Sequence, residues 1–255
     1  MRCCSNSIRK HFKDVARQAT ITFLSGRKMR MEREEQTMKK NLTEIVMILD
    51  RSGSMGGLEK DTIGGYNAFL ERQKKTEGTV LVSTVLFDDT AEVLHDRAEL
   101  SKISPMTEKE YYVRGCTALL DALGEAIHHI GNVHKYAREE DRPEHTIFVI
   151  TTDGMENASR HYTFDQVRRM VMRQQEQYGW EFLFFGANMD AIAAAGRFGI
   201  HEDRAVTFIS DRVGTKLNYA AMSEAVTEMR MAPKGTRISG AWKKDIEEDV
   251  RKRQK

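Results

Sequence analysis

The sequence lacks the features of a secreted, fibrous or membrane-spanning chain. Its 255 residues include only three prolines and three cysteines, Cys3, Cys4 and Cys116, without a C-x-x-C spacing. The odd cysteine count argues against a disulfide framework or a Cys-rich zinc site and favours a reducing compartment. No apolar run approaches the roughly 18 residues of a membrane-spanning helix, and the run at 21–24 is too short for a signal-peptide core. We therefore expect a globular cytoplasmic protein.

Charge divides the chain into an acidic centre and two basic ends. Residues 1–44 carry 11 Lys and Arg against 5 Asp and Glu, residues 231–255 carry 8 against 4, and residues 45–230 carry 21 against 29. Basic ends can contact nucleic acid, but neither end has a nucleic-acid motif or interleaved aromatic residues. We interpret residues 1–42 as a basic, flexible extension, 43–230 as one domain and 231–255 as a basic tail or helix. Met38 also resembles a start of translation.

From residue 43 onward, short apolar runs alternate with segments of helical periodicity. Strands are predicted at 44–49, 79–87, 91–95, 145–151, 180–185 and 204–209. Helices are predicted at 57–74, 117–136, 163–178, 189–198 and 216–230. This alternation predicts an α/β fold with three layers, in which helices flank a doubly wound, mostly parallel, Rossmann-like sheet. Ligands bind such sheets beyond the carboxyl ends of the strands.

Three segments place oxygen-bearing side chains at those strand ends. Asp50, Ser52 and Ser54 follow the first strand on alternate residues, Thr117 precedes the helix at 117–136, and Asp153 follows the strand at 145–151. Two carboxylates and three hydroxyls are hard ligands and suit a hard divalent cation. Mg²⁺ prefers an octahedron of oxygens with few carboxylates and retained waters, so five side chains leave a position open. Mn²⁺ and Ca²⁺ are alternatives to Mg²⁺.

The pattern Asp50-x-Ser52-x-Ser54, followed by Thr117 and Asp153, resembles the metal-ion-dependent adhesion site (MIDAS) of von Willebrand factor type A domains. The resemblance spans about residues 43–230 and includes the order of the elements. It implies that Ser52, Ser54 and Thr117 contact the metal, that Asp50 and Asp153 reach it directly or through water, and that a partner protein's carboxylate completes the coordination. Small, stand-alone, intracellular bacterial members of the family are the most similar in organisation.

Residues next to these segments have plainer interpretations. Cys116 is expected to be a small buried residue and not a reactive thiol. Glu156 and Asn157 either line the site or cap a helix or loop. Asp88 and Asp89 end the second strand, where they either support the site or form a turn.

Three histidines lie in the helix predicted at 117–136. His128, His129 and His134 are not spaced to place two metal ligands on one helical face, so surface or interface positions are expected.

Three functional hypotheses follow. The favoured one is a non-catalytic module that binds a protein partner through the metal, because none of the five side chains is a nucleophile with a base beside it. The second is a Mg²⁺-dependent phosphohydrolase of the haloacid-dehalogenase-like type, in which Ser52 would replace the general acid. The third is a metal-independent scaffold that acts through the basic ends. The sequence does not indicate an oligomeric state.

Overall fold

The computed structural model describes residues 41–253, within the unit Asn41–Lys255. The expectations for residues 1–40, including the start at Met38, lie outside the described residues. The described part holds six strands: β1 (Leu42–Asp50), β2 (Thr79–Phe87), β3 (Ala91–Glu99), β4 (His145–Thr152), β5 (Glu181–Ala187) and β6 (Ala205–Phe208). Its α-helices are α2 (Glu59–Lys74), α3 (Leu119–Tyr136), α4 (Phe164–Tyr178), α5 (Ala191–Arg197), α6 (Arg212–Met231) and α7 (Lys244–Arg253).

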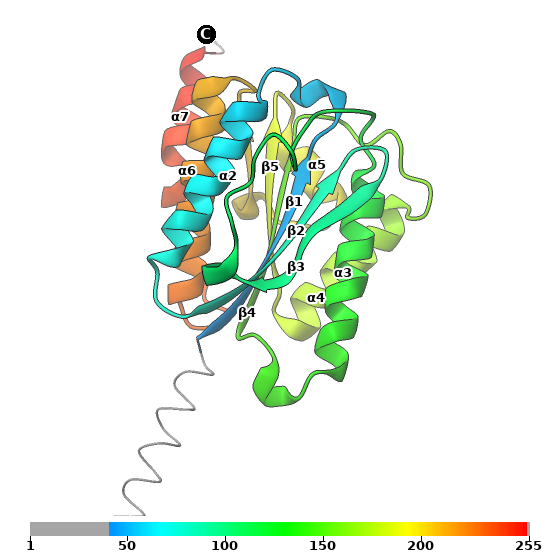
Figure 1. Cartoon of the computed structure of the whole chain (residues 1–255), viewed down its shortest axis with the longest axis vertical. Helices are drawn as coiled ribbons and strands as arrows, with labels where there is room; N and C mark the ends of the chain where they lie inside the picture. The colour runs from blue at the N-terminus through cyan, green and yellow to red at the C-terminus, as the bar shows by residue number, and fades with distance from the viewer. Residues whose placement is uncertain (1–40, 254–255) are drawn as a thin grey trace, which may run out of the picture. The chain divides into compact units, whose positions relative to one another are not determined.

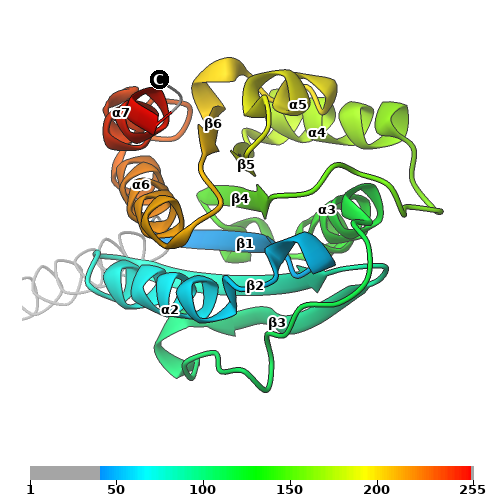
Figure 2. The same cartoon turned by 90° about the horizontal axis from the view of Figure 1, so that it is seen from above.

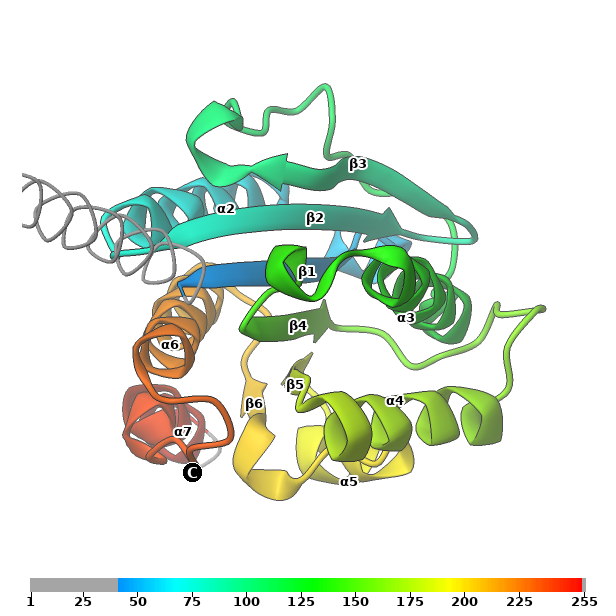
Figure 3. The same ribbon diagram turned by 90° about the horizontal axis from the view of Figure 1, so that it is seen from below.

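The strands form one sheet in the order β3-β2-β1-β4-β5-β6, and only β3 runs antiparallel to its neighbour. Helices α2, α6 and α7 lie on one side of the sheet and α3, α4 and α5 on the other (Figure 1, Figure 3). The predicted three-layer, mostly parallel fold is confirmed. From β1 the chain continues to β2 on one side, while β4 pairs on the other side. This reversal of strand order creates a switch point at the carboxyl end of β1.

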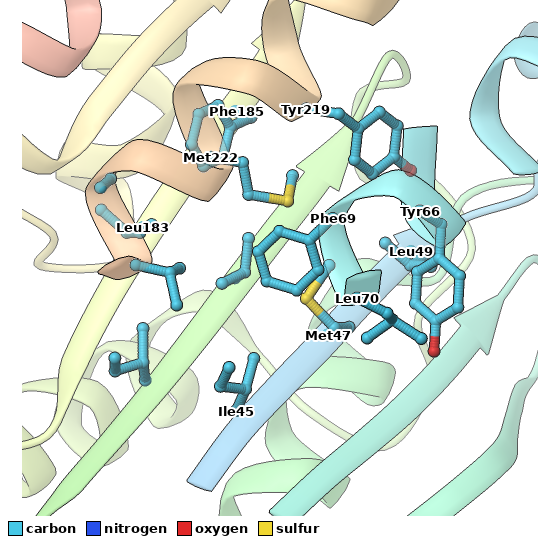
Figure 4. Close-up of a cluster of buried hydrophobic side chains, with 14 of the residues drawn as sticks. Ile45, Met47, Leu49, Tyr66, Phe69, Leu70, Leu183, Phe185, Tyr219 and Met222 are labelled. Atoms are coloured by element: carbon cyan, nitrogen blue, oxygen red, sulfur yellow. The ribbon is translucent and has the colours of Figure 1, made fainter. Parts of the chain in front are cut away.

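The central strand β1 is buried on both faces, as its continuous apolar run predicts. Ile45, Met47 and Leu49 pack with Phe69 of α2 and Met222 of α6 in one core cluster (Figure 4). On the other face, Val46 and Ile48 pack with apolar residues of α3 and α5. Burial of both faces fixes the strand's register, since a slip of one residue would exchange the faces. The end of β1 therefore has a defined position.

Two parts of the fold differ from their expected form or add to it. Strand β3 extends to Glu99 and not to residue 95, because an edge strand with partly exposed, polar residues has no apolar run to mark its length. The segment at 231–255, expected to be a basic tail or helix, contains helix α7, which packs on the domain through its own Ile246 and through Trp242 in the turn just before it, both almost fully buried. The Nζ of Lys243 donates to the Ala205 carbonyl at 2.8 Å, so the edge of β6 is covered.

Within residues 41–253, none of the helices combines the length and apolar character that crossing a membrane requires.

Candidate metal centre

All five predicted site residues lie together at the carboxyl edge of the sheet. Figure 2 shows the arrangement of the strands and helices from above. Asp50 ends β1, and Ser52 and Ser54 follow it in a turn that contains the short 3₁₀ helix Gly53–Met55. Thr117 lies just before α3, and Asp153 directly follows β4. The alternation D-x-S-x-S thus brings three polar side chains of one turn toward the loops of α3 and β4.

A chain of close oxygen contacts links four of the five side chains. The Oγ1 of Thr117 donates to the Ser52 Oγ at 3.1 Å, and the Ser52 and Ser54 hydroxyls lie 3.1 Å apart. The Ser54 Oγ donates to the Asp153 Oδ1 at 2.5 Å. Ser52 and Thr117 are buried, whereas Ser54 is exposed. The cluster therefore opens to solvent at Ser54.

Asp50 is fully buried and receives hydrogen bonds from neutral donors only. Its Oδ1 accepts from the Ser52 N–H at 2.7 Å, and its Oδ2 accepts from the Thr152 hydroxyl at 2.6 Å. Burial raises the pKa of the Asp50 carboxyl, the hydrogen bonds from Ser52 and Thr152 oppose this, and the nearby Asp153 carboxyl adds to it. Ionised Asp50 therefore carries a negative charge that no cationic side chain among residues 41–253 bonds directly.

Asp153 has a similar electrostatic environment but is partly exposed. Burial raises its pKa, and the hydroxyls of Ser54 and Ser210 oppose the shift. The Ser210 Oγ lies 3.4 Å from the Asp153 Oδ2, so the loop between β6 and α6 also reaches the site. Two carboxylates with raised pKa values in one small cluster favour an added cation, which would stabilise both ionised forms.

Backbone hydrogen bonds hold the loops of the site in register. The Gly53 N–H donates to the Gly115 carbonyl at 3.1 Å, and the Arg114 N–H donates to the Arg51 carbonyl at 2.9 Å. Gly115 has φ +65°, a left-handed conformation that glycine adopts without strain. The Tyr111 hydroxyl donates to the Asp50 carbonyl at 2.6 Å. The first two loops of the site thus form one unit.

Sequence reasoning missed Thr152 and Ser210 and left the roles of other neighbours open. The structure resolves two of these as capping residues: the Asn157 Oδ1 accepts from the Thr117 N–H at 2.9 Å, and the Glu156 Oε2 accepts from the Leu120 N–H at 2.8 Å. The sequence indicated Thr152 only weakly, because this residue directly precedes Asp153 and so could be expected at the same edge of the sheet. Nothing in the sequence indicated that Ser210 would reach the site.

The expectation for Cys116 is wrong, because its side chain is exposed. The Cys116 N–H donates to the Asp89 Oδ1 at 2.9 Å, which fixes the backbone at this point. The Thr117 hydroxyl points into the protein toward Ser52. The side chain of the preceding residue, Cys116, therefore lies on the outer side of the loop.

The donor set fits a hard divalent cation. Oxygens of three hydroxyls and two carboxylates gather here, and no group of three or more His, Cys, Asp or Glu side chains suited to a metal occurs among residues 41–253. Gly154 leaves room for the cluster, because a Cβ at this position would lie 2.6 Å from the Thr117 Oγ1 and 3.4 Å from the Ser54 Oγ. As metal ligands, the five residues stay a prediction that this geometry supports.

Comparisons with known proteins show the fold. No family model matches the sequence, and no curated protein matches it. The structure is similar to the von Willebrand factor domain of the type V pili tip protein Mfa5 from Porphyromonas gingivalis, with 13% identity and a TM-score of 0.51 over 77% of this chain and 98% of that one. It is also similar to a von Willebrand factor type A protein from Catenulispora acidiphila, with 14% identity and a TM-score of 0.50 over 74% and 42% of the two chains.

A third similar structure is that of proximal thread matrix protein 1 from the mussel byssus, described with a zinc-occupied MIDAS motif. Its identity is 17% and its TM-score 0.50, over 74% of this chain and 46% of that one. The chain thus spans less than half of the mussel and Catenulispora proteins. Together these likenesses show that the chain has the fold of von Willebrand factor type A domains.

Proposed function

We propose that Asp50, Ser52, Ser54, Thr117 and Asp153 hold a divalent cation, with Mg²⁺ the first choice, and that an Asp or Glu of a partner protein completes its coordination. The observation that carries the proposal is the position of Asp50, a buried carboxylate that only neutral groups bond. A metal with three hydroxyl ligands stays electron-poor, so an incoming carboxylate gains both charge compensation and a bond.

The structural neighbours support this proposal. The mussel byssus protein is described with zinc in its MIDAS motif. The same fold in this chain places hydroxyls and carboxylates at the carboxyl edge of its sheet, at Ser52, Thr117 and Asp153.

Exposed apolar side chains beside the site favour a protein partner. Met155, two residues after Asp153, is 72% exposed, and Val213, three residues after Ser210, is 53% exposed. Because Ser210 contacts Asp153, the loop that carries Met155 and the start of α6 that carries Val213 both lie near the site. Exposed apolar groups beside a polar centre are typical of surfaces that a second protein covers.

We further propose that the module is non-catalytic and cytoplasmic. The five side chains include no histidine or lysine as a general base, and Ser52 stands where a phosphohydrolase of the haloacid-dehalogenase-like type needs a second carboxylate. An exposed free thiol at Cys116 suits a reducing compartment. Turnover of an aryl phosphate with Mg²⁺ that Asp50→Ala abolishes would favour the phosphohydrolase instead.

Thermal unfolding tests the metal site directly. Wild type and Asp50→Ala are compared in EDTA and in Mg²⁺, Mn²⁺ or Ca²⁺, with Asp96→Ala, an exposed residue of β3, as the matched control. A ligand at one hundred times its dissociation constant stabilises the folded state by about 2.7 kcal/mol. We expect metal to stabilise wild type and Asp96→Ala but not Asp50→Ala. Absence of a shift in wild type at millimolar metal would favour a metal-independent scaffold.

A random peptide display library, selected on the protein in Mg²⁺ or in EDTA, tests the partner. We expect peptides enriched only with metal to contain Asp or Glu. Enrichment that is independent of metal, or of the acidic residue, would contradict this part of the proposal.

A further inference from the structure

The candidate metal loop contains a buried positive charge. Arg51 lies between Asp50 and Ser52, and its side chain is fully buried. A buried guanidinium needs an acidic partner, because removal from water without one is strongly unfavourable. Within this loop, the carboxylate next to it in sequence is Asp50, which accepts only from Ser52 and Thr152. Some other group must therefore hold Arg51.

That group is Asp88, at the end of β2. Its Oδ2 accepts from the Arg51 Nε at 2.7 Å and from the Arg114 Nε at 2.7 Å. Its Oδ1 accepts from the Thr90 N–H at 3.1 Å, and its backbone carbonyl accepts from the Ala118 N–H at 2.8 Å. Asp88 is itself buried, with only 3% of its side chain exposed. One carboxylate thus joins both loops that carry the site's hydroxyls.

Two neighbours complete this arrangement. The Glu92 Oε2 lies 2.8 Å from a terminal nitrogen of Arg51 and adds a second negative charge. The Tyr112 ring lies 5.4 Å from the guanidinium carbon of Arg51 and 5.4 Å from that of Arg114, within the range of cation–π attraction. These contacts keep both guanidinium groups on the side of the loops where Asp88 lies.

From this geometry we infer that Asp88 is a positioning residue for the candidate metal site. It fixes the loop of Ser52 against the loop of Thr117, and it binds the guanidinium of Arg51 that would otherwise compete for Asp50. The inference rests on the proposed function, since its consequence is tighter metal binding.

The amino end of the same sheet offers a matched control. Glu44 is also a fully buried carboxylate with two side-chain partners, the Arg97 Nε at 2.7 Å and the His134 Nε2 at 2.5 Å. It lies at the start of β1, whereas the metal site lies at its end. Glu44→Gln therefore disturbs a comparable buried network without touching the candidate metal loops.

Mn²⁺ binding is measured on the full chain from the electron paramagnetic resonance signal of free Mn²⁺, for wild type, Asp88→Asn and Glu44→Gln. Urea unfolding of each metal-free variant accompanies the titration. Loss of a residue that orients metal ligands typically lowers metal affinity by about 10- to 100-fold. We expect a decrease of at least about tenfold for Asp88→Asn and less than about twofold for Glu44→Gln, whose site loops are intact.

The outcomes separate this inference from the proposed function. Failure of wild type to bind Mn²⁺ would overturn both. Binding by wild type with equal affinity in folded Asp88→Asn would overturn the inference alone, as would equal losses in the two variants. If Asp88→Asn does not fold, Arg114→Gln replaces it, because Arg114 is half-exposed and its loss leaves the Arg51–Asp88 pair in place. An unchanged affinity in that variant would overturn the inference in the same way.

Discussion

The two ends of β1 each carry a buried acid, and the two acids are satisfied in opposite ways. Glu44 and Asp50 share one face of the strand, since alternate residues face the same side, and six residues separate them by about 20 Å. The oxygens of Glu44 accept from Arg97 and His134, whereas those of Asp50 accept from the Ser52 N–H and the Thr152 hydroxyl. The guanidinium of Arg97 and the imidazole of His134 thus hold Glu44 in place, whereas only neutral groups among residues 41–253 bond the Asp50 carboxylate.

The comparison shows how a sheet can keep a binding carboxylate separate from a structural one. Cations also occur at the carboxyl end, but Arg51 and Arg114 bond Asp88 and not Asp50. Neutral donors orient Asp50 without neutralising it, and burial raises its pKa, so the metal-free site stays electrostatically unfavourable at neutral pH. A bound cation would stabilise the ionised Asp50 carboxylate. Glu44 would gain less from a cation, because Arg97 already binds it.

The largest expected effect is on stability, at the amino end. Glu44→Ala removes a fully buried acid and leaves the partly buried side chains of Arg97 and His134 without their shared partner. Removal of one member of a buried ion pair typically lowers the free energy of unfolding by about 3–5 kcal/mol. Urea unfolding in EDTA measures the loss, and Mn²⁺ titration should show unchanged affinity. A weakened affinity would mean that the two ends are coupled and that the comparison is wrong.

The next effect is on metal binding, at the carboxyl end. Gly154→Ala places a Cβ 2.6 Å from the Thr117 Oγ1 and should displace that hydroxyl, lowering metal affinity by roughly 100-fold. The matched control is Gly131→Ala in α3, where the nearest atom to the new Cβ is a flexible Gln174 nitrogen at 3.5 Å. Metal-dependent thermal shifts of both variants measure the difference. Equal shifts in the two variants would place Thr117 outside the metal site.

A third acid, Asp121 of α3, has three neutral donors and sharpens the comparison. Its carboxylate accepts from the N–H groups of Arg160, His161 and Tyr162 at 2.7, 2.9 and 2.8 Å. Burial alone would raise its pKa, but these backbone bonds outweigh burial and lower it. These backbone bonds, together with the electrostatic effect of His161, stabilise the ionised form of Asp121, whereas burial prevails at Asp50.

Asp121→Asn should lower the free energy of unfolding by about 1.5–3 kcal/mol at neutral pH, the usual contribution of hydrogen bonds to a charged group. Because the folded pKa is lowered, this stability is present above the unfolded pKa, near 3.8, and is lost as pH falls through the folded value. Urea unfolding at pH 7, 5 and 3 should show the difference from wild type shrinking only at pH 3. Glu125→Gln, an exposed change on the same helix, is the control. A difference that is constant down to pH 3 would contradict the role of charge.

The sequence predicted the sheet well because apolar runs report burial directly. The strand β2 has the expected bounds, and α4 begins within one residue of its expected start, where Thr163 and Gln166 form a capping box. The start of α6 was placed four residues late. Gly214 interrupts the helical pattern there, although it is needed because a Cβ would lie 1.9 Å from the Ile209 carbonyl oxygen. Close approach of two backbones leaves no periodic signal in a sequence.

The site was predictable where its residues share a motif and not where they meet through distant loops. The five oxygen-bearing residues stand at strand ends, so the fold class already brings them to one edge. The contacts of Asp88 with Arg51 and Arg114 depend on the paths of three loops. From the sequence alone, Asp88 could either support the metal site or form a turn. His134 was expected at the surface or at an interface, and it lies largely buried against Glu44. The sequence could not show this pairing, because Glu44 lies on β1 and His134 on α3.

The smallest expected effect concerns the neutral donors of Asp50. Thr152→Val keeps the side chain's shape but removes the hydroxyl that donates to the Asp50 Oδ2 at 2.6 Å. Loss of one orienting hydrogen bond should lower Mn²⁺ affinity by about tenfold and the free energy of unfolding by about 1 kcal/mol. Thr151→Val is the matched control, since Thr151 precedes it on the opposite face of β4 and bonds Asn218 instead. An equal affinity in the two variants would mean that burial alone orients Asp50, and that neutral hydrogen bonds are not what distinguishes it from Glu44.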